Sequence, residues 1–317
     1  MLKTQTVDEC IDGYLDLSKE VFKVDQVLAG HIPVGDDCCR FDYKILEDAI
    51  KKIIQGKLSD ENCRMNAIPN AANKNCPTFV VAKTAANVNG PAIVFRTYRG
   101  KQIRPSECAL WQAARATSAA PTFFKPMSID RPRPAITYID GGIGHNNPSE
   151  VALDEARRIW PTCTQFGLVS IGTGRPKANS IQLSEAAGAN PDVQQSLLED
   201  IKSYIPNIVI RGWDAAKNLT PGAKALIGMA SALAQFATNS EDAHQRVQRA
   251  ARSIEKEKQF PYFRFNVPRD VGDIGLGDWN KSDDLAAHTG NYMKEYETEE
   301  RRSLCVKFLL STSPPCK

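Results

Sequence analysis

Apolar residues near the start of the chain follow a helical spacing in two segments. Residues 7–22 are expected to form a helix, because Thr6 and Glu9 have the spacing of a capping box and the apolar positions recur every three or four residues. One face of this segment carries Val7, Ile11, Tyr14, Leu15, Ser18 and Phe22. A second helix is expected to begin after Asp42 as N-cap and to end at Gly56 as the C′ glycine.

The middle of the chain alternates short apolar runs with helical segments. Polar residues dominate Leu58–Asn75, which we expect to be a surface loop. The apolar runs predict strands at Thr78–Lys83, Ala92–Tyr98, Ala135–Ile139, Gly167–Ile171 and Phe263–Val267. Helices are expected over Glu107–Thr117, which is rich in small residues, and over Pro148–Trp160 with Asn147 as cap. Strand, glycine turn, helix and strand is the order typical of an open, mainly parallel α/β sheet.

The C-terminal third is more polar and more helical. A helix is expected to begin at Asn239 or Ser240, and Leu285–Leu310 is expected to form a single terminal helix. The apolar stretch Ala225–Ala237 is too short to span a bilayer. A buried helix is the favoured interpretation of this stretch, and a lipid-facing lid is the alternative. Residues 180–238 contain no motif that separates a lid from a plain helical cover.

Composition narrows the function classes. The 317 residues are 42% hydrophobic and 24% charged, and the formal net charge is +3, which is typical of a globular chain and not of a nucleic-acid binder. The nine cysteines form no C-x-x-C pair and the four histidines are scattered, so we expect reduced thiols, no metal and no other cofactor. Without a signal peptide or a transmembrane segment, the expected location is the cytoplasm, and the mild basicity is compatible with peripheral membrane contact.

The residues with the clearest chemistry are Asp140, Gly141 and Gly142. Asp-Gly is a common turn pair, but this one follows a predicted strand, where open α/β sheets place their active sites. It also stands in an ordered series of motifs. These are Trp111-Gln112-Ala113-Ala114-Arg115-Ala116-Thr117-Ser118-Ala119-Ala120-Pro121 before it, and Asn146-Asn147-Pro148 and Ser170-Ile171-Gly172-Thr173-Gly174 after it.

This series resembles the second half of the patatin-like phospholipase family, from roughly Thr6 to Val267 and most specifically over Ala113–Gly174. The resemblance implies a three-layer α/β/α fold. It also implies a lipid acyl hydrolase that cleaves esters of phospholipids or acylglycerols with a serine–aspartate dyad. Asp140 matches the general base of the dyad, and Gly141 and Gly142 complete the D-G-[AG] motif. The residues specify neither the lipid class nor the acyl position, and they give no oligomeric state.

A carboxylate can serve such a dyad without a histidine. A serine hydroxyl is a weak nucleophile and needs a base within hydrogen-bond reach. A partly desolvated carboxylate in a fixed position can accept its proton directly. Gly141 and Gly142 would let the backbone turn sharply beside the nucleophile.

The chain departs from the family pattern because it contains no G-x-S-x-G elbow and no glycine-rich oxyanion loop. We therefore expect residues 1–270 to be an N-terminally truncated patatin-like domain, residues 271–317 to be a helical extension, and the chain to be inactive alone. The two serines nearest the matched motifs do not replace the nucleophile, since Ser118 lies in a small-residue packing segment and Ser170 inside a strand.

Three functional interpretations stay open. The chain is an incomplete form of a hydrolase, a non-catalytic product that binds lipid or protein, or an effector module of a larger receptor-type protein. Arg115 could meet a lipid phosphate, but pairing with a nearby carboxylate is favoured. His145 follows the Asp140 motif and is interpreted as a surface loop residue.

Overall fold

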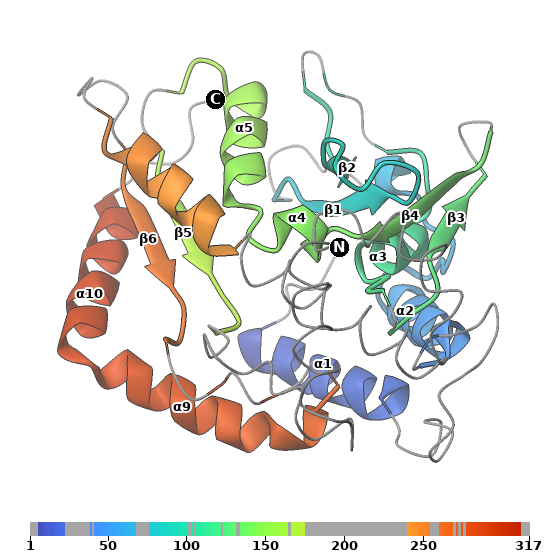
Figure 1. The fold of residues 1–317 in the computed structure, drawn as a ribbon, viewed down its shortest axis with the longest axis horizontal. Coiled ribbons are helices and arrows are strands. Elements are labelled where there is room, and N and C mark those ends of the chain that lie inside the picture. Colours follow the sequence, from blue (N-terminus) through green and yellow to red (C-terminus); the bar gives the residue numbers. More distant parts are fainter. Residues whose placement is uncertain are drawn as a thin grey trace, which may run out of the picture. The chain divides into compact units, whose positions relative to one another are not determined.

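The computed structural model describes residues 6–22, 39, 41–67, 76–100, 103, 106–121, 123–130, 134–163, 166–174, 240–253, 260–268, 271, 274 and 277–311 (Figure 1). The chain divides into two compact units. The first comprises Met1–Arg99, Arg104–Gly144 and Ile181–Phe236. The second comprises Gly100–Ile103, His145–Ser180 and Ala237–Lys317. The division into domains predicted at residue 270 stays a prediction.

Two helices open the first unit. Helix α1 (Val7–Val21) begins with the predicted capping box, and helix α2 (Tyr43–Leu58) has Asp42 as its N-cap. The predicted end of α2 at Gly56 is wrong, because Ser59 adopts the left-handed conformation there and the helix runs through the glycine.

The buried face of α1 differs from the predicted one. Val7, Ile11 and Tyr14 are 75%, 52% and 64% exposed, whereas Ser18 and Val21 are buried. Only the second half of α1 packs into the core cluster around Val21, which also contains Phe41, Leu46, Phe123 and Phe124. The helical spacing therefore predicted the helix correctly, but it did not predict which part of the apolar face is buried.

The loop after α2 is less open than expected. It contains a short 3-10 helix, η2 (Met65–Ala67), and Met65 is buried in the core beneath the sheet.

A four-stranded sheet forms the centre of the first unit. Its strands are β1 (Phe79–Thr84), β2 (Ile93–Arg96), β3 (Met127–Ile129) and β4 (Ile136–Asp140), in the order β2-β1-β4-β3. Every pairing in this sheet is antiparallel, so the prediction of a mainly parallel sheet is wrong. The reason is that β1–β2 and β3–β4 are joined by short connections, which can link only antiparallel neighbours.

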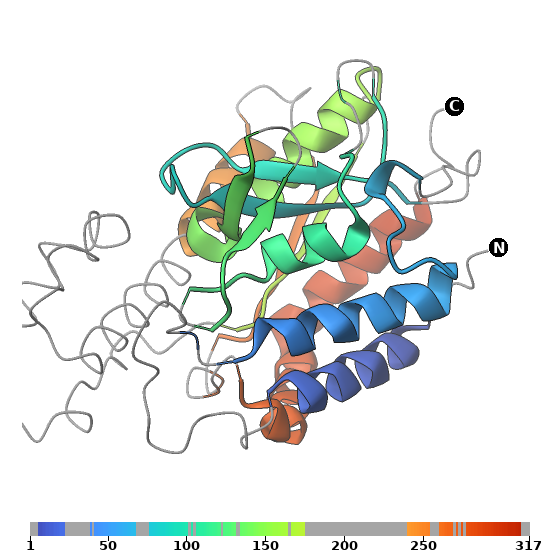
Figure 2. The ribbon, with the colours of Figure 1, turned by 90° about the vertical axis from the view of Figure 1, so that its right-hand side faces the viewer.

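Helix α3 (Leu110–Thr117) covers one face of this sheet, and α2 and then α1 lie beyond it (Figure 2). Ala113 and Ala116 are buried with Ala82, Phe95 and Tyr138. The small side chains of α3 let the helix axis approach the sheet closely, as expected from the sequence.

The second unit contains a parallel pair of strands, β5 (Leu168–Ile171) and β6 (Tyr262–Phe265). Helix α5 (Ser149–Ile159) and a helix at residues 240–251 pack with them around Leu153, Val247 and Phe260. The predicted strand–helix–strand unit is thus partly wrong, because β5 pairs with β6 and not with β4.

The C-terminal elements are a 3-10 turn, η5 (Trp279–Lys281), followed by α9 (Ser282–Lys294) and α10 (Tyr296–Ser311). The single predicted terminal helix is wrong, since Glu295 is extended (φ −62°, ψ 137°) and separates the two. Both Ala225–Ala237 and residues 180–238 lie outside the described residues. Among the helices that are described, none combines the length and apolar character needed to cross a membrane.

Candidate active site around Asp140

Asp140 is the last residue of β4, at the strand end predicted from the sequence. It pairs with Ala82 of β1, and its N–H donates to the carbonyl of Ala119 at 3.0 Å. Ala119 and Ala120 are both buried. The end of the small-residue segment therefore holds the backbone of Asp140 on the edge of β4 that faces away from β1.

The Asp140 carboxylate is held by one of its two oxygens. Oδ1 accepts the N–H of Gly142 at 2.6 Å, and none of the described residues donates to Oδ2. Burial raises the pKa of the Asp140 carboxyl to about 6, and the Gly142 N–H opposes this rise because it stabilises the charged form. At pH 7 the group is thus mostly ionised and is a stronger base than an ordinary aspartate.

The glycines after Asp140 serve three different purposes. A Cβ on Gly141 would lie 2.1 Å from the carbonyl oxygen of Val81, so only glycine fits there. Gly142 contributes its N–H to the carboxylate. The segment labelled α4 (Gly142–His145) has the backbone of a type II turn, with Ile143 at φ −68°, ψ 96° and Gly144 at φ 89°, ψ −14°. We call residues 140–145 the Asp140 turn.

Gly144 is a structural residue that the sequence interpretation missed. Its positive φ is strained for any residue with a side chain. The available signal was the third glycine in Asp140-Gly141-Gly142-Ile143-Gly144, which is one more than the family motif requires.

The end of α3 is tied to the same place. Thr117 Oγ1 donates to the carbonyl of Val81 at 2.5 Å, and this is the carbonyl against which Gly141 packs. Ser118 follows as the C-cap of α3 and is half-buried. Its hydroxyl makes no recorded bond to Asp140, and it lies on a helix end and not on a strand-to-helix elbow.

The other residues named from the sequence lie elsewhere or act differently. Arg115 is fully buried, its Nη2 donates to the carbonyl of Lys125 at 2.8 Å, and it faces the rings of Tyr43 and Phe124. Within the described parts of the chain no carboxylate forms the expected ion pair with it, and its complete burial leaves the guanidinium closed to solvent. His145 is half-buried, and the recorded hydrogen bonds of Asp140 do not involve it.

Ser170 belongs to a second polar group, in the second unit, which we call the Asn147 cluster: Asn147, Ser149, Ser170, Ser240 and Arg264. Ser170 Oγ accepts from Arg264 Nη1 and shares a hydrogen bond with Ser149 Oγ, both at 2.8 Å. It lies inside β5, as predicted. Its hydroxyl is buried and occupied, so it is not presented as a nucleophile.

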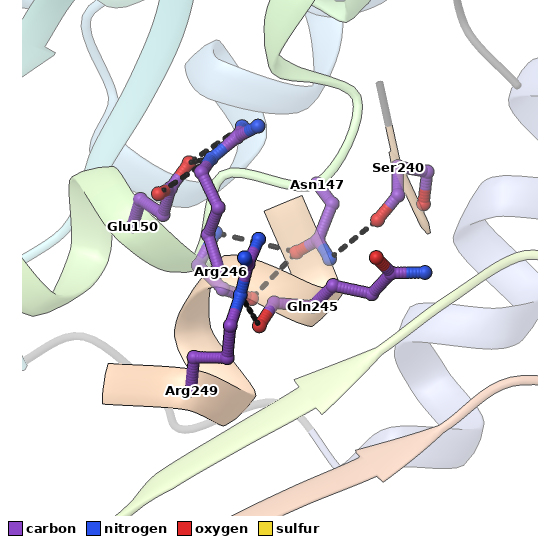
Figure 3. Close-up of polar contacts among 7 residues, drawn as sticks. Asn147, Glu150, Ser240, Gln245, Arg246 and Arg249 are labelled. Atoms are coloured by element: carbon purple, nitrogen blue, oxygen red, sulfur yellow. Dashed lines mark hydrogen bonds and ion pairs between the residues drawn. The ribbon is translucent and has the colours of Figure 1, made fainter. Parts of the chain in front are cut away.

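Asn147 holds this cluster together (Figure 3). Its Nδ2 donates to the carbonyl of Ser240 at 3.1 Å, and its Oδ1 accepts from the N–H and the Oγ of Ser149. It was predicted to cap α5, and it does bond to Ser149, although Pro148 is the residue at the N-cap. Beside it, Arg246 and Glu150 form a bidentate ion pair on the surface.

The Gly172-Thr173-Gly174 motif belongs to the second unit and packs against its residues Asn266 and Val271. A Cβ on Gly172 would lie 2.1 Å from Asn266 Oδ1, and a Cβ on Gly174 (φ 104°) would lie 2.1 Å from the side chain of Val271. These glycines are required by close packing. The described residues contain no group of three or more potential metal ligands.

Comparison with known proteins relates the first half of the chain to one family. Residues 7–153 match the model described as patatin-like phospholipase. Human calcium-independent phospholipase A2-gamma is 29% identical over 177 residues, which cover 53% of this chain and 21% of that protein. Phospholipase A I of Arabidopsis thaliana is 26% identical over 227 residues, or 55% of this chain and 17% of that protein. The rat 85/88 kDa calcium-independent phospholipase A2 is 27% identical over 209 residues, or 66% of this chain and 23% of that protein.

The chain therefore spans about a fifth of the length of these curated relatives. The Asp140 turn and the Asn147 residue both lie inside the segment that matches the family model.

Proposed function

We propose, from the patatin-like phospholipase segment at residues 7–153, that this chain supplies the general base of a serine–aspartate lipid acyl hydrolase. The observation that carries the proposal is the Asp140 carboxylate, which is fixed through Oδ1 and whose Oδ2 accepts from none of the residues that the structure describes. The three-layer α/β/α architecture and the phospholipid or acylglycerol substrate belong to the same proposal.

In this mechanism Oδ2 of Asp140 takes the proton of a serine hydroxyl as the serine oxygen bonds to the ester carbonyl carbon. The resulting tetrahedral intermediate then releases the alcohol, which takes the proton back from Asp140. Water repeats both steps on the acyl-enzyme. A carboxyl with a pKa of about 6 suits both directions, since it is a base at pH 7 and still returns the proton.

The serine is not within these 317 residues in an elbow sequence. We propose that a longer product carries it, and that the chain of 317 residues alone does not turn over esters. Sequencing transcripts from their 5′ ends tests the first part, and an in-frame stop codon upstream in every transcript would reject it.

Mutation of the longer product tests the base. Asp140→Asn should lower phospholipid hydrolysis by several orders of magnitude, because the amide cannot accept the proton. Asp130→Asn is the matched control, since Asp130 is an exposed aspartate of the same unit, and it should leave the rate unchanged. Full activity in Asp140→Asn would reject the proposal. For the 317-residue chain, ester turnover that is lost with Asp140→Asn would show that an unexpected nucleophile is present.

A further inference from the structure

Lys83 is a buried lysine in the middle of the sheet. It lies in β1 and is 4% exposed. Its Nζ donates to the carbonyl of Gly90, and no carboxylate pairs with it in the described part of the chain. Burial lowers the pKa of the Lys83 ammonium. A charge placed among apolar side chains with a single backbone acceptor lowers the stability of the fold.

The ammonium lies against the Asp140 turn. Lys83 pairs with Ile139, the residue before Asp140. A Cβ on Gly144 would lie 3.4 Å from Cε and 3.6 Å from Nζ of Lys83. Ile139 and Ile143 pack together with Val88 in a small cluster on this side of the strands. The lysine therefore joins the loop that contains Gly90 to the turn that follows Asp140.

Gly144 lies close to the end of Lys83, since a Cβ built there would be in van der Waals contact with Cε and Nζ. Its positive φ would strain any residue with a side chain, so a substitution at Gly144 would disturb the turn through the backbone. Displacement of the turn would in turn move Gly142, whose N–H holds Oδ1 of Asp140.

We propose that Lys83 is a positioning residue for Asp140: its ammonium anchors the Asp140 turn to the Gly90 carbonyl and so keeps the Gly142 N–H on the carboxylate. The functional meaning of this inference rests on the proposed base role of Asp140. The positioning itself does not, because it concerns hydrogen bonds within the chain.

The test is an NMR titration of the 317-residue chain that follows the Asp140 carboxyl carbon and the Gly142 amide. Burial raises the pKa of the Asp140 carboxyl, and the Gly142 N–H lowers it. In Lys83→Met the hydrogen bond from the Gly142 N–H to Asp140 Oδ1 should weaken, and this disfavours the carboxylate. The Asp140 midpoint should therefore rise by about half to one pH unit, the size of one net hydrogen bond.

Three further variants make the result interpretable. Lys83→Arg keeps the charge and the donors, and should return the midpoint toward the wild-type value. Lys52→Met removes an exposed lysine of the same unit and should change nothing. If Lys83→Met does not fold, Lys83→Gln replaces it and should also raise the midpoint, because its uncharged donor lies one bond closer to the backbone and cannot make the same contact with the Gly90 carbonyl.

If Lys83 had a structural role alone, its replacement would lower the free energy of unfolding without changing the titration midpoint of Asp140. An unchanged Asp140 midpoint and Gly142 amide shift in a folded Lys83→Met or Lys83→Gln variant would overturn the proposal. Failure of the proposed function would be seen separately, as hydrolysis that is insensitive to Asp140→Asn in a longer product.

Discussion

The Asp140 turn and the Asn147 cluster both contain polar groups with little exposure, but these groups differ in how many hydrogen-bond partners they have. In the Asn147 cluster, Asn147 and Ser170 each bond to more than one partner. In the Asp140 turn, a carboxylate without a recorded counterion is held by one backbone N–H and leaves an oxygen available.

This difference separates a fully paired arrangement from one that keeps a charge with a single backbone donor. Buried polar groups that are fully paired stabilise a fold or are neutral to it, whereas a charge kept without a partner lowers stability and is typical of functional sites. Substitutions in the two regions should therefore change stability with opposite signs where they remove a polar group.

The largest expected effect comes from Gly141→Ala. The added Cβ would meet the Val81 carbonyl oxygen at 2.1 Å, which is a backbone atom of the central sheet that cannot move away freely. The free energy of unfolding should fall by about 3 kcal/mol or more, measured by urea denaturation. Gly13→Ala is the control, because Gly13 lies in α1 with nothing near its Cβ position, and it should stabilise by about 0.5–1 kcal/mol. Equal effects of the two substitutions would show that the close approach at Gly141 is not present.

The Asn147 cluster should be sensitive to the loss of its central amide. Asn147→Ala leaves the Ser240 carbonyl and the Ser149 donors without their partner in a buried place. We expect a loss of about 2–3 kcal/mol in the free energy of unfolding. Gln245→Ala, at an exposed position on the neighbouring helix (Figure 3), is the control and should have little effect. A neutral Asn147→Ala would mean that the cluster is solvated and not a closed network.

Removal of the Asp140 charge should have the opposite sign. The folded-state pKa of Asp140 lies above the usual value of an aspartate, so the folded chain binds this proton more tightly than the unfolded chain does. The stability that comes from the protonated form is complete below about pH 4 and is lost as the pH rises through about 6. Asp140→Asn should therefore stabilise by about 2 kcal/mol at pH 7.5 and by almost nothing at pH 4. Unfolding curves at the two pH values measure this, and a destabilised variant at pH 7.5 would contradict the raised pKa.

The sequence predicted the place of Asp140 at a strand end but not the surroundings of this residue. Periodicity, capping residues and the Asp140 motif predicted most helices and strands and the position of Asp140 at a strand end, because these are local properties. Strand pairing was wrong, since the direction of β1 relative to β4 depends on residues far apart in the chain.

Contacts that depend on the assembled fold were missed for the same reason. The exposed half of α1, the Lys83 contact with Gly144 and the burial of Arg115 follow from which element covers which face. No spacing along the chain encodes them. Gly144 was missed too, but its positive φ could have been predicted, because a third glycine close to Asp140 is a local signal in the sequence.

The smallest expected effect tests whether the polar contacts at the edge of the Asn147 cluster matter at all. Arg246 bonds to both carboxylate oxygens of Glu150 at 2.8–3.0 Å, but the two side chains are 48% and 41% exposed. Solvent and salt screen such a pair, so Arg246→Gln should lower the free energy of unfolding by less than about 1 kcal/mol, and by less still in 1 M NaCl. A double-mutant cycle with Glu150→Gln isolates the pair from other losses. A coupling energy as large as the effect of Asn147→Ala would show that the cluster extends to the surface and that its stability does not come from its buried members alone.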